Sequence, residues 1–264
     1  APPCSDAGAL LALAERLELL LSIFSKGQRP TGSSDPYALR RAGNGIVQIL
    51  WDRGWRLPLQ TLLARASSHW SGLFPAFQFD PASLAEDLGQ LLCQRMVSQF
   101  EEDGFPADLV QAVSGAGVSS SRLLEDPVDA RVRLLLLRDL RTGGRLQAVQ
   151  AVVQRASKLA EKGNLDTTQL DAEPVIDASL FDSPSETELL KQLQTLSPLA
   201  QACDYEGLAS ELQGAARALE AFFDGENSVM VMTDNDAVRR NRLNLLGVLR
   251  NQASVLARFE NIQA

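Results

Sequence analysis

The chain of 264 residues is long enough for one large or two modest domains, and its 45% hydrophobic residues can form a packed core. Leu, Ala, Arg and Glu are abundant while aromatic residues make up only 6%, which is a composition typical of helical proteins. The net charge of -8 argues against non-specific nucleic-acid binding, although it leaves room for a local basic face.

The shortage of histidine and cysteine excludes several kinds of catalytic site. His69 is the only histidine, so zinc sites of His and Cys, histidine-containing hydrolase triads and HD-type metal clusters lack the residues they need. Cys4, Cys93 and Cys203 lie far apart, which indicates a reducing compartment rather than a disulfide framework. We therefore expect no catalytic residue and no metal ligand in this chain.

The first predicted helix covers residues 7–25, where leucines form a broad apolar stripe at helical spacing. Charged residues interrupt this stripe, so it does not predict a membrane span. Gly27 and Pro30 end the helix. Residues 30–35, PTGSSD, are turn formers without an apolar period, and we expect a loop there.

The second predicted helix covers residues 36–52. A side-chain oxygen of Ser34 or Asp35 can accept hydrogen bonds from the free N–H groups of its first turn. Pro36 stands at the first helical position, where the missing N–H has no cost.

Two glycines inside this helix, Gly43 and Gly45, are poor helix formers, and we expect another backbone to approach closely there. A third helix is predicted over residues 58–68, where leucines again recur at helical spacing. Residues 71–80, SGLFPAFQFD, break the pattern and predict a boundary between domains.

The pattern beyond residue 80 again predicts helices. They cover residues 81–103, 106–113, two segments after 126 that join at Gly143 and Gly144, and then 186–203, 205–223 and 237–259. Residues 114–121 are a predicted connecting loop, and the acidic residues 165–187 a surface excursion. Met230 and Met232 lie in the loop before the last helix, and we expect them to fill a groove in the bundle. No strand alternation of useful length occurs, so the sequence predicts an all-α fold.

Arg40 and Arg41 follow the loop over residues 30–35 and fall at the start of the second helix. Two guanidinium groups at such a place can bind phosphate. Local ion pairs with Asp35 and Asp52 explain them equally well. The residues alone leave both interpretations open.

Five arginines after residue 130 form the densest basic cluster of the chain. They are Arg131, Arg133, Arg138, Arg141 and Arg145. Arg131 and Arg138 share one face of a helix. In an acidic chain this cluster is the best candidate for a surface that faces phosphate, and a solvated helix face is an equal alternative.

The last predicted helix combines arginine and asparagine beside its apolar stripe, at Arg239, Arg240, Asn241 and Arg242. Arginine stacks on bases and binds phosphate, and asparagine bonds to base edges as donor and acceptor. The combination is typical of proteins that bind unpaired RNA bases. Polar residues beside a core stripe are also ordinary in helices.

Four separated blocks resemble the beta-subunit family of bacterial-type glycyl-tRNA synthetases. Residues 14–50 contain GQRPTGSSDPYALRR, similar to the family pattern G-x-x-P-[TK]-G-S-x-D-P-[FY]-A-L-R-R. Residues 218–250 contain FFDGENSVMVMTDNDAVRRNRLNLL, which is similar to the family's ending. FEEDGFPADLVQAVS at 100–114 and VVQRASKLAEKG at 152–163 match the intervening helices in the expected order. The resemblance covers nearly the whole chain.

The resemblance implies a chain of helical bundle domains. Residues 1–78 would be the C-terminal part of an HD-like helical domain, residues 79–126 connecting helices, and residues 127–264 an anticodon-binding helical domain similar to that of arginyl-tRNA synthetases. The N-terminal residues APPCSDAG lack the basic segment of a signal peptide. We expect them to be the cut end of a longer subunit.

The resemblance also implies a function in glycine–tRNA ligation, as a subunit portion that is not itself catalytic. The anticodon contacts would come from the helical C-terminal domain, at Arg239, Arg240, Asn241, Arg242, Arg155, Arg131 and Arg138. Arg40 and Arg41 would either contact the tRNA or lock the HD-like domain through buried ion pairs. Glycine would be activated on a separate alpha subunit.

The implied partners are glycine tRNA, the alpha subunit and a second beta subunit, with no membrane. ATP and Mg²⁺ would serve the alpha subunit, and no cofactor is expected in this chain. The implied location is the cytoplasm or, in a plastid-bearing organism, the plastid stroma.

Departures from the family pattern define two alternatives. Glu15 stands where the family has an Asp similar to the last metal ligand of HD enzymes, and the His-Asp pair of that fold is missing. A residual metal-dependent phosphohydrolase is therefore one alternative, weakened by the near absence of histidine. A helical scaffold that binds a partner helix near Met230 and Met232 is the other. Residues 225–228 also lengthen the loop before the last helix relative to the family pattern.

Overall fold

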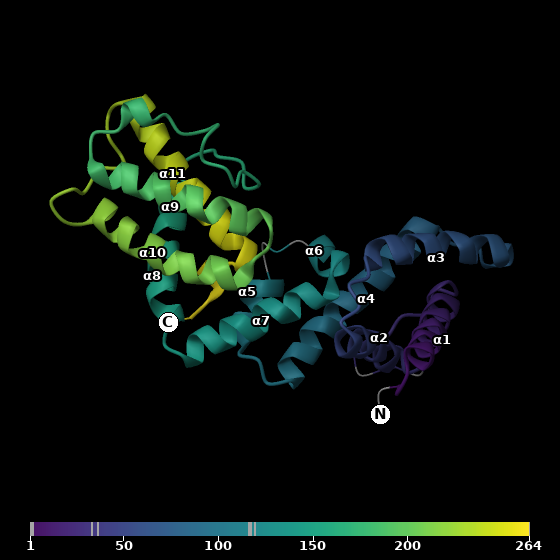
Figure 1. The fold of residues 1–264 in the computed structure, drawn as a ribbon. Coiled ribbons are helices and arrows are strands. Elements are labelled where there is room, and N and C mark those ends of the chain that lie inside the picture. The colour runs from purple at the N-terminus through teal and green to yellow at the C-terminus, as the bar shows by residue number, and fades with distance from the viewer. Residues whose placement is uncertain (1–2, 33, 36, 116–117, 119, 264) are drawn as a thin grey trace. The chain divides into compact units, whose positions relative to one another are not determined.

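A computed structural model describes residues 3–32, 34–35, 37–115, 118 and 120–263. These residues form eleven α-helices and three short 3-10 helices (Figure 1). The described part of the chain contains no strand, only an isolated bridge between Thr31 and Ser34. The predicted all-α fold is confirmed. Within the same described residues, no helix has both the length and the apolar character that crossing a bilayer requires.

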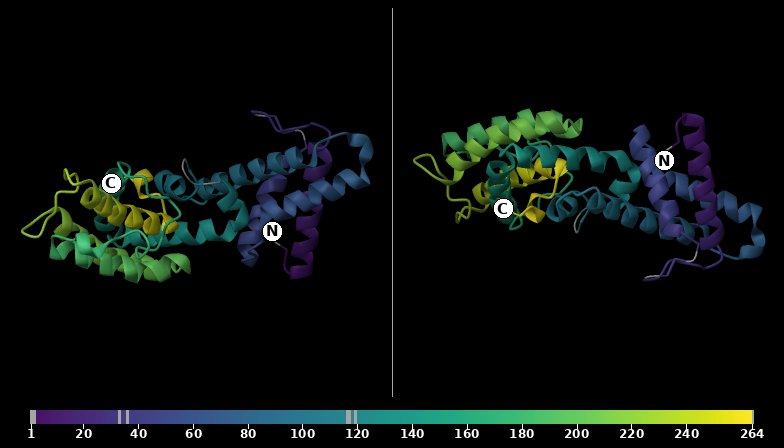
Figure 2. Two further views of the ribbon diagram at one scale, coloured as in Figure 1. Left: turned by 90° about the horizontal axis from the view of Figure 1, so that it is seen from above. Right: turned by 90° about the horizontal axis from the view of Figure 1, so that it is seen from below.

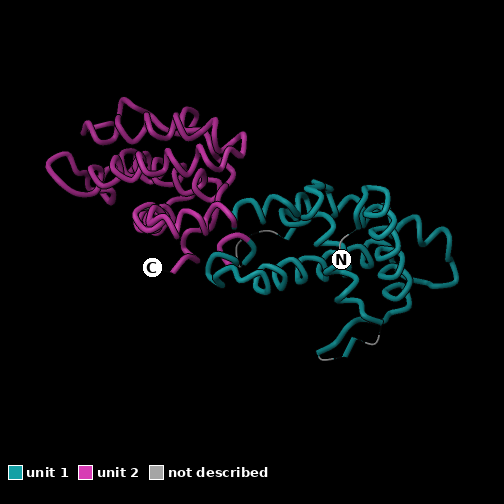
Figure 3. The backbone as a smooth tube through the Cα atoms, turned by 60° about the horizontal axis from the view of Figure 1, so that its bottom comes forward, with its two compact units in different colours: residues 1–110, 114–134 teal, residues 111–113, 135–264 magenta. Residues whose placement is uncertain are grey.

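The chain divides by its internal contacts into two compact units (Figure 3). Unit 1 consists of residues 1–110 and 114–134, and unit 2 of residues 111–113 and 135–264. The division falls inside α7 (Pro127–Thr142), whose first half belongs to unit 1 and second half to unit 2. The boundaries predicted after residues 78 and 126 refer to the domains that the family resemblance implies. They are not the same as the two compact units, and they stay predictions.

Unit 1 is built on four long helices. They are α1 (Asp6–Phe24), α2 (Leu39–Arg53), α3 (Leu59–Leu73) and α4 (Pro81–Glu102), followed by the short helices α5 (Ala107–Ser114) and α6 (Ser120–Glu125). The helix α4 packs against α1, α2 and α3, which places the core around it. Trp51 of α2 stacks on Phe100 of α4 with 4.7 Å between ring centroids, and its indole N–H donates to the Pro127 carbonyl at 2.7 Å. The sequence did not predict α6, which lies partly in the expected loop.

The start of α2 confirms one of the two predicted caps. The Asp35 carboxylate accepts hydrogen bonds from the backbone N–H groups of Leu39 at 2.7 Å and Arg40 at 3.0 Å. The helix begins at Leu39 rather than at 36, because Ala38 has a left-handed backbone with φ of 56°. The predicted role of Pro36 lies outside the described residues.

The close approach predicted at the two glycines of α2 exists, but its partners are different from those expected. A Cβ at Gly43 would lie 2.9 Å from Cγ of Arg95, and a Cβ at Gly45 would collide with the guanidinium of Arg16. The expected backbone contact is therefore wrong. Arginine side chains occupy the space because glycine leaves it empty.

Unit 2 packs four helices and a long connecting loop. The helices are α8 (Leu146–Ala160), α9 (Pro184–Gln201), α10 (Tyr205–Phe223) and α11 (Asp236–Leu256). The helices α9 and α10 lie side by side as a hairpin (Figure 2), and α11 packs against α8, α9 and α10. Leu245, Leu246 and Leu249 of α11 are fully buried, so α11 is the central helix of this unit.

A buried ion pair joins α11 to the start of α9. Arg242, 5% exposed, donates from Nε to Glu186 at 2.8 Å, and Glu186 is fully buried. Two backbone N–H groups, those of Asp182 and Ser183, also donate to Glu186, at 2.8 and 3.0 Å. The hydrogen bond from Arg242 to Glu186 raises the pKa of the guanidinium, which therefore stays charged. Glu186 thus completes the capping box of α9 and neutralises Arg242 at the same time.

The carboxamide groups of α11 bind the backbone of the loop before α9. Asn241 and Asp177 exchange two hydrogen bonds, at 2.8 and 3.0 Å, and Asn244 donates to Val175 at 2.9 Å. Further along the helix, Asn251 and Gln252 donate to loop carbonyls between residues 166 and 170. The predicted surface excursion over 165–187 therefore lies against α11, and its last residues already belong to α9.

The position of the two loop methionines corrects a prediction. Met230 is 74% exposed and Met232 44% exposed, while Val231 between them is 6% exposed. The loop bends at Val231 and Met232, and of these three side chains it is the valine that packs inward. The methionines therefore do not fill a groove of the bundle.

The first prediction concerns the Arg242–Glu186 pair. We expect Arg242→Met to lower the opening free energy of α9 and α11 by about 3 kcal/mol, because it leaves a buried carboxylate without its cation. Hydrogen exchange of backbone amides, followed by mass spectrometry, measures that free energy helix by helix. Arg240→Met is the matched control, since Arg240 is exposed, and a change within about 0.5 kcal/mol is expected. Equal effects of the two substitutions would contradict a structural role of the pair.

The second prediction concerns thiol reactivity. Burial raises the pKa of the Cys93 thiol to about 11, while Cys4 and Cys203 are exposed. Thiolate is the reactive form, so at pH 8 iodoacetamide should modify Cys93 at least ~10-fold more slowly than the two exposed thiols. Peptide mass spectrometry of a labelling time course gives the three rates. Denaturant should remove the difference, and equal rates in the folded chain would show that Cys93 is accessible.

Candidate nucleic-acid interface

The four anticodon candidates of α11 occupy two different environments. Asn241 and Arg242 are buried, and their side chains bind the Asp177 backbone and Glu186 inside unit 2. Arg239 is half-buried and donates to the Thr233 carbonyl at 2.8 Å. Arg240 is exposed. Of this group, only the first two arginines reach the surface.

The predicted arginine cluster of α7 is divided in the same way. Arg131 and Arg133 belong to unit 1, whereas Arg138, Arg141 and Arg145 belong to unit 2. Arg133 is 1% exposed and donates to Asp129 at 2.8 Å, which makes it a buried member of an ion pair. The Arg131 guanidinium lies 5.3 Å from the ring centroid of Trp51. Arg138 and Arg145 are exposed.

A groove of about 560 Å³ lies between α8 and α10 in unit 2. Small side chains from both helices, Ala148, Ala151 and Ala216, line it and leave its space open. Three guanidinium groups surround these alanines: Arg145 at the start of α8, Arg155 near its end and Arg217 on α10. Two carboxylates, Glu220 and Asp224, also line the groove, so its three cations leave it with a formal net charge of only +1.

Arg155 is held at one end of this groove. Its guanidinium lies 4.2 Å from the ring centroid of Phe223 and donates to the Asp224 carboxylate at 2.5 Å. The hydrogen bond from Arg155 lowers the pKa of Asp224, so the carboxyl is ionised at neutral pH. The ring and the carboxylate thus orient a planar cation that is still about half exposed. A guanidinium in this state can stack on an unpaired base.

The groove contains one basic residue that the sequence did not single out. Arg217 is exposed, and among the described residues its guanidinium forms no hydrogen bond or ion pair. It stands alone in GAARALEAFF, so it did not belong to any arginine cluster. The alanines on either side of Arg217 in the sequence could have identified it, because small side chains on a helix face leave open space beside a cation.

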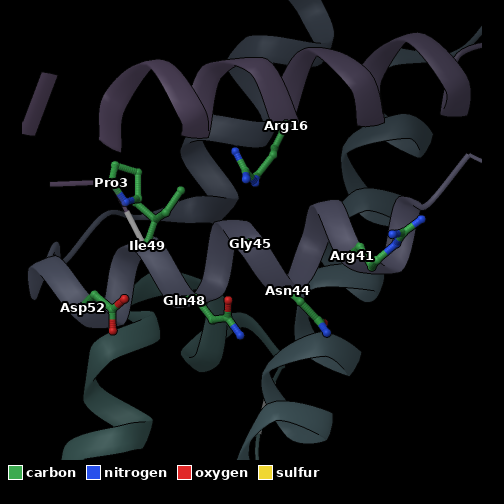
Figure 4. A pocket seen from close by; sticks show the side chains of 8 residues that line it. All are labelled: Pro3, Arg16, Arg41, Asn44, Gly45, Gln48, Ile49 and Asp52. Carbon is green, nitrogen blue, oxygen red and sulfur yellow. The ribbon is translucent and has the colours of Figure 1, made fainter. Parts of the chain in front are cut away.

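A second, polar pocket of about 390 Å³ lies in unit 1 between α1 and α2 (Figure 4). Arg41 lines it, together with Arg16 of α1, whereas the guanidinium of Arg40 donates to the Gly32 carbonyl at 2.7 Å. Among the described residues, neither Arg40 nor Arg41 forms an ion pair with Asp35 or Asp52. The local ion pairs and the buried ion pairs considered for these arginines are therefore wrong.

No group of three or more His, Cys, Asp or Glu side chains in the described part of the chain is arranged to hold a metal ion. Glu15, which stands at the position resembling a metal ligand, is exposed and lies 3.7 Å from Arg16.

Comparison with known proteins assigns both halves of the chain. Residues 1–115 match the family model described as glycyl-tRNA synthetase beta subunit, and residues 149–257 match the one described as DALR anticodon binding domain. The second match contains Arg155, Arg217, Phe223 and Asp224, four of the residues that line the α8–α10 groove.

Several curated relatives carry the name glycine–tRNA ligase beta subunit. The one from Picosynechococcus sp. is 41% identical over 97% of this chain and 36% of its own length, and the one from Acaryochloris marina is 40% identical over the same shares. The one from Streptococcus mutans is 34% identical over 99% of this chain and 35% of its own length. The chain therefore spans about a third of the length of these relatives. Because two family models and alignments over nearly the whole of this chain agree, this chain belongs to the glycyl-tRNA synthetase beta subunit family.

Proposed function

We propose that this chain is the tRNA-binding part of a glycine–tRNA ligase beta subunit. In this proposal unit 2 binds the anticodon of glycine tRNA, and a separate alpha subunit joins glycine to the tRNA with ATP and Mg²⁺. The chain itself supplies binding and orientation rather than a catalytic group. Its place of action would be the cytoplasm or a plastid stroma, and a contact between two beta subunits stays a prediction.

The observation that supports this proposal is the α8–α10 groove. It lies largely within the segment that matches an anticodon-binding family model, and it carries three guanidinium groups around an open space. The chain as a whole has a net charge of -8, so a local concentration of cations is needed to attract RNA. Small alanine side chains give a base or a sugar room to approach the helices.

The arginines of the groove would bind different parts of the RNA. Arg155 lies over the Phe223 ring and is about half exposed, so its guanidinium can stack on an unpaired base. Arg145 and Arg217 are exposed at other points of the lining and can bind backbone phosphates. Base stacking would then select an unpaired strand, while the phosphate contacts set its register.

The remaining candidates have different roles in the proposal. Arg239 and Arg240 lie in the first turns of α11, where Arg240 is exposed and Arg239 is already paired with Asp236 at 2.5 Å. Arg242 and Asn241 support the surface from inside, because their side chains are already bonded within the unit. Arg138, exposed near the end of α7, is a further cation of unit 2 that can bind phosphate.

No observation favours the two alternative functions over this one. The described residues show no cluster suited to a phosphohydrolase metal centre. A partner helix was expected to bind in a groove near Met230 and Met232. These two side chains point outward and do not form such a groove.

The third prediction tests the stacking group. We expect Arg155→Ala to weaken binding of glycine tRNA about tenfold, because it removes one stacking contact together with its charge. Fluorescence anisotropy with labelled tRNA at a fixed, stated salt concentration gives the dissociation constant. Lys191→Ala is the matched control: Lys191 is an exposed cation on α9 outside the groove. Equal affinities of the two variants would contradict a role of the groove.

The fourth prediction concerns specificity. Wild-type chain should prefer glycine tRNA over the same tRNA with altered anticodon bases, and Arg155→Ala should reduce this preference. Arg217→Ala should instead weaken the binding of both tRNAs equally. It should also lower the slope of log K against log salt by about 1, as expected for a lost phosphate contact. Titrations at several salt concentrations separate the two effects. Equal, steeply salt-dependent binding of both tRNAs by wild type would leave only non-specific charge attraction.

A further inference from the structure

The side of α10 that lines the α8–α10 groove carries a carboxylate at its middle. Its lining residues recur at helical spacing and therefore share one side of the helix: Gln213, Ala216, Arg217, Glu220 and Phe223. At about 3.6 residues per turn, Glu220 lies midway across this side. The lining from α8, the other helix of the groove (Figure 1), includes Ala148 and Ala151, whose small side chains leave space open.

The Glu220 carboxylate has no partner within the described part of the chain. Its side chain is exposed and forms no hydrogen bond or ion pair there, although Arg217 stands only three residues before it. The other carboxylate of the lining, that of Asp224, is paired with Arg155 at 2.5 Å and helps to orient that arginine. Glu220 has no comparable role in the fold, so its carboxylate is available to a ligand.

This carboxylate opposes the binding of an RNA backbone. A phosphate and a carboxylate repel each other, so Glu220 offsets part of the attraction by the three arginines of the groove. A repulsive group in a binding surface contributes to selectivity when the right ligand offers it a donor and the wrong ligand an acceptor. The chemistry of the base edge therefore decides whether Glu220 favours or disfavours a ligand.

Glu220 is also a neighbour of the group that is proposed to stack on a base. Phe223 follows it by three residues, and residues three apart are neighbours on the surface of a helix. The Arg155 guanidinium lies 4.2 Å from the centroid of the Phe223 ring. The polar edge of a base that stacks on Arg155 can therefore reach the Glu220 carboxylate.

We propose that Glu220 selects an unpaired base with an exocyclic amino group and rejects uracil. This inference rests on the proposed binding of RNA in the same groove. An ionised carboxylate accepts hydrogen bonds and donates none. The amino groups of cytosine, adenine and guanine are donors to such an acceptor. Uracil instead presents carbonyl oxygens on both sides of its single ring N–H, and these oxygens repel a carboxylate.

The fifth prediction compares two single-stranded RNA hexamers, one of cytidine and one of uridine. They carry the same phosphates and differ in the base edge, so the ratio of their dissociation constants isolates base selection. At a fixed salt concentration, fluorescence anisotropy with the whole chain should give about tenfold tighter binding of the cytidine hexamer, as expected for a hydrogen bond to a charged group.

Two substitutions on α10 test the residue itself. Glu220→Gln should reduce the ratio to within about twofold, because the amide can accept from cytosine and also donate to uracil. Glu206→Gln is the matched control: Glu206 is an exposed carboxylate of the same helix outside the groove, and its loss changes the net charge equally. This control should keep the wild-type ratio. Circular dichroism confirms that each variant is folded.

The inference and the proposed function fail in different ways. If Arg155→Ala weakens tRNA binding but wild type binds the two hexamers equally, only the role of Glu220 is overturned. A wild-type ratio in Glu220→Gln, or the same loss of ratio in Glu206→Gln, has the same consequence. If Arg155→Ala leaves the binding of tRNA and of both hexamers unchanged, RNA does not bind in this groove, and both proposals are overturned.

Discussion

Unit 2 depends on one buried carboxylate, that of Glu186. It accepts hydrogen bonds from the backbone at the start of α9 and from Arg242 in the middle of the unit. A charge so deeply buried is stable only when its lone pairs and its charge are both satisfied. The same guanidinium also donates to the Met230 carbonyl at 3.1 Å. One ion pair thus fixes the start of a helix, the position of α11 and the loop that precedes it.

The carboxamides of α11 extend this arrangement along the helix. Asn241, Asn244, Asn251 and Gln252 bind the backbone of the loop between α8 and α9, which has little regular structure of its own. Backbone groups that lie against a protein interior need partners, and these side chains provide them. Because α11 is occupied in this way, it cannot offer the same groups to RNA. Among the described residues of unit 2, the groove between α8 and α10 and the exposed Arg240 remain accessible to a ligand.

Space and orientation distinguish the accessible arginines from the others. Arg155 lies against Phe223 and Asp224 beside a row of alanines, and Arg16 lies over a glycine. In both places small residues of a facing helix leave room, and a neighbouring group orients the planar cation. Binding costs less conformational entropy when the side chain is held beforehand. The two arginines belong to different units and differ in their neighbours, an aromatic ring beside Arg155 and a glycine beside Arg16.

The sequence by itself determined where the helices of this protein lie and to which family it belongs. Apolar spacing, the turn formers at 30–35 and the paired glycines at 143–144 act locally, so the all-α fold, the Asp35 cap and most helix bounds follow from them. Tertiary structure alone decided which polar residues remain free. Arg240 and Arg242 are two positions apart and look alike in sequence, yet the helix turns one toward solvent and the other toward Glu186. Arg155 and Arg217 are far apart in the chain, and only the packing of α8 against α10 brings them to one groove.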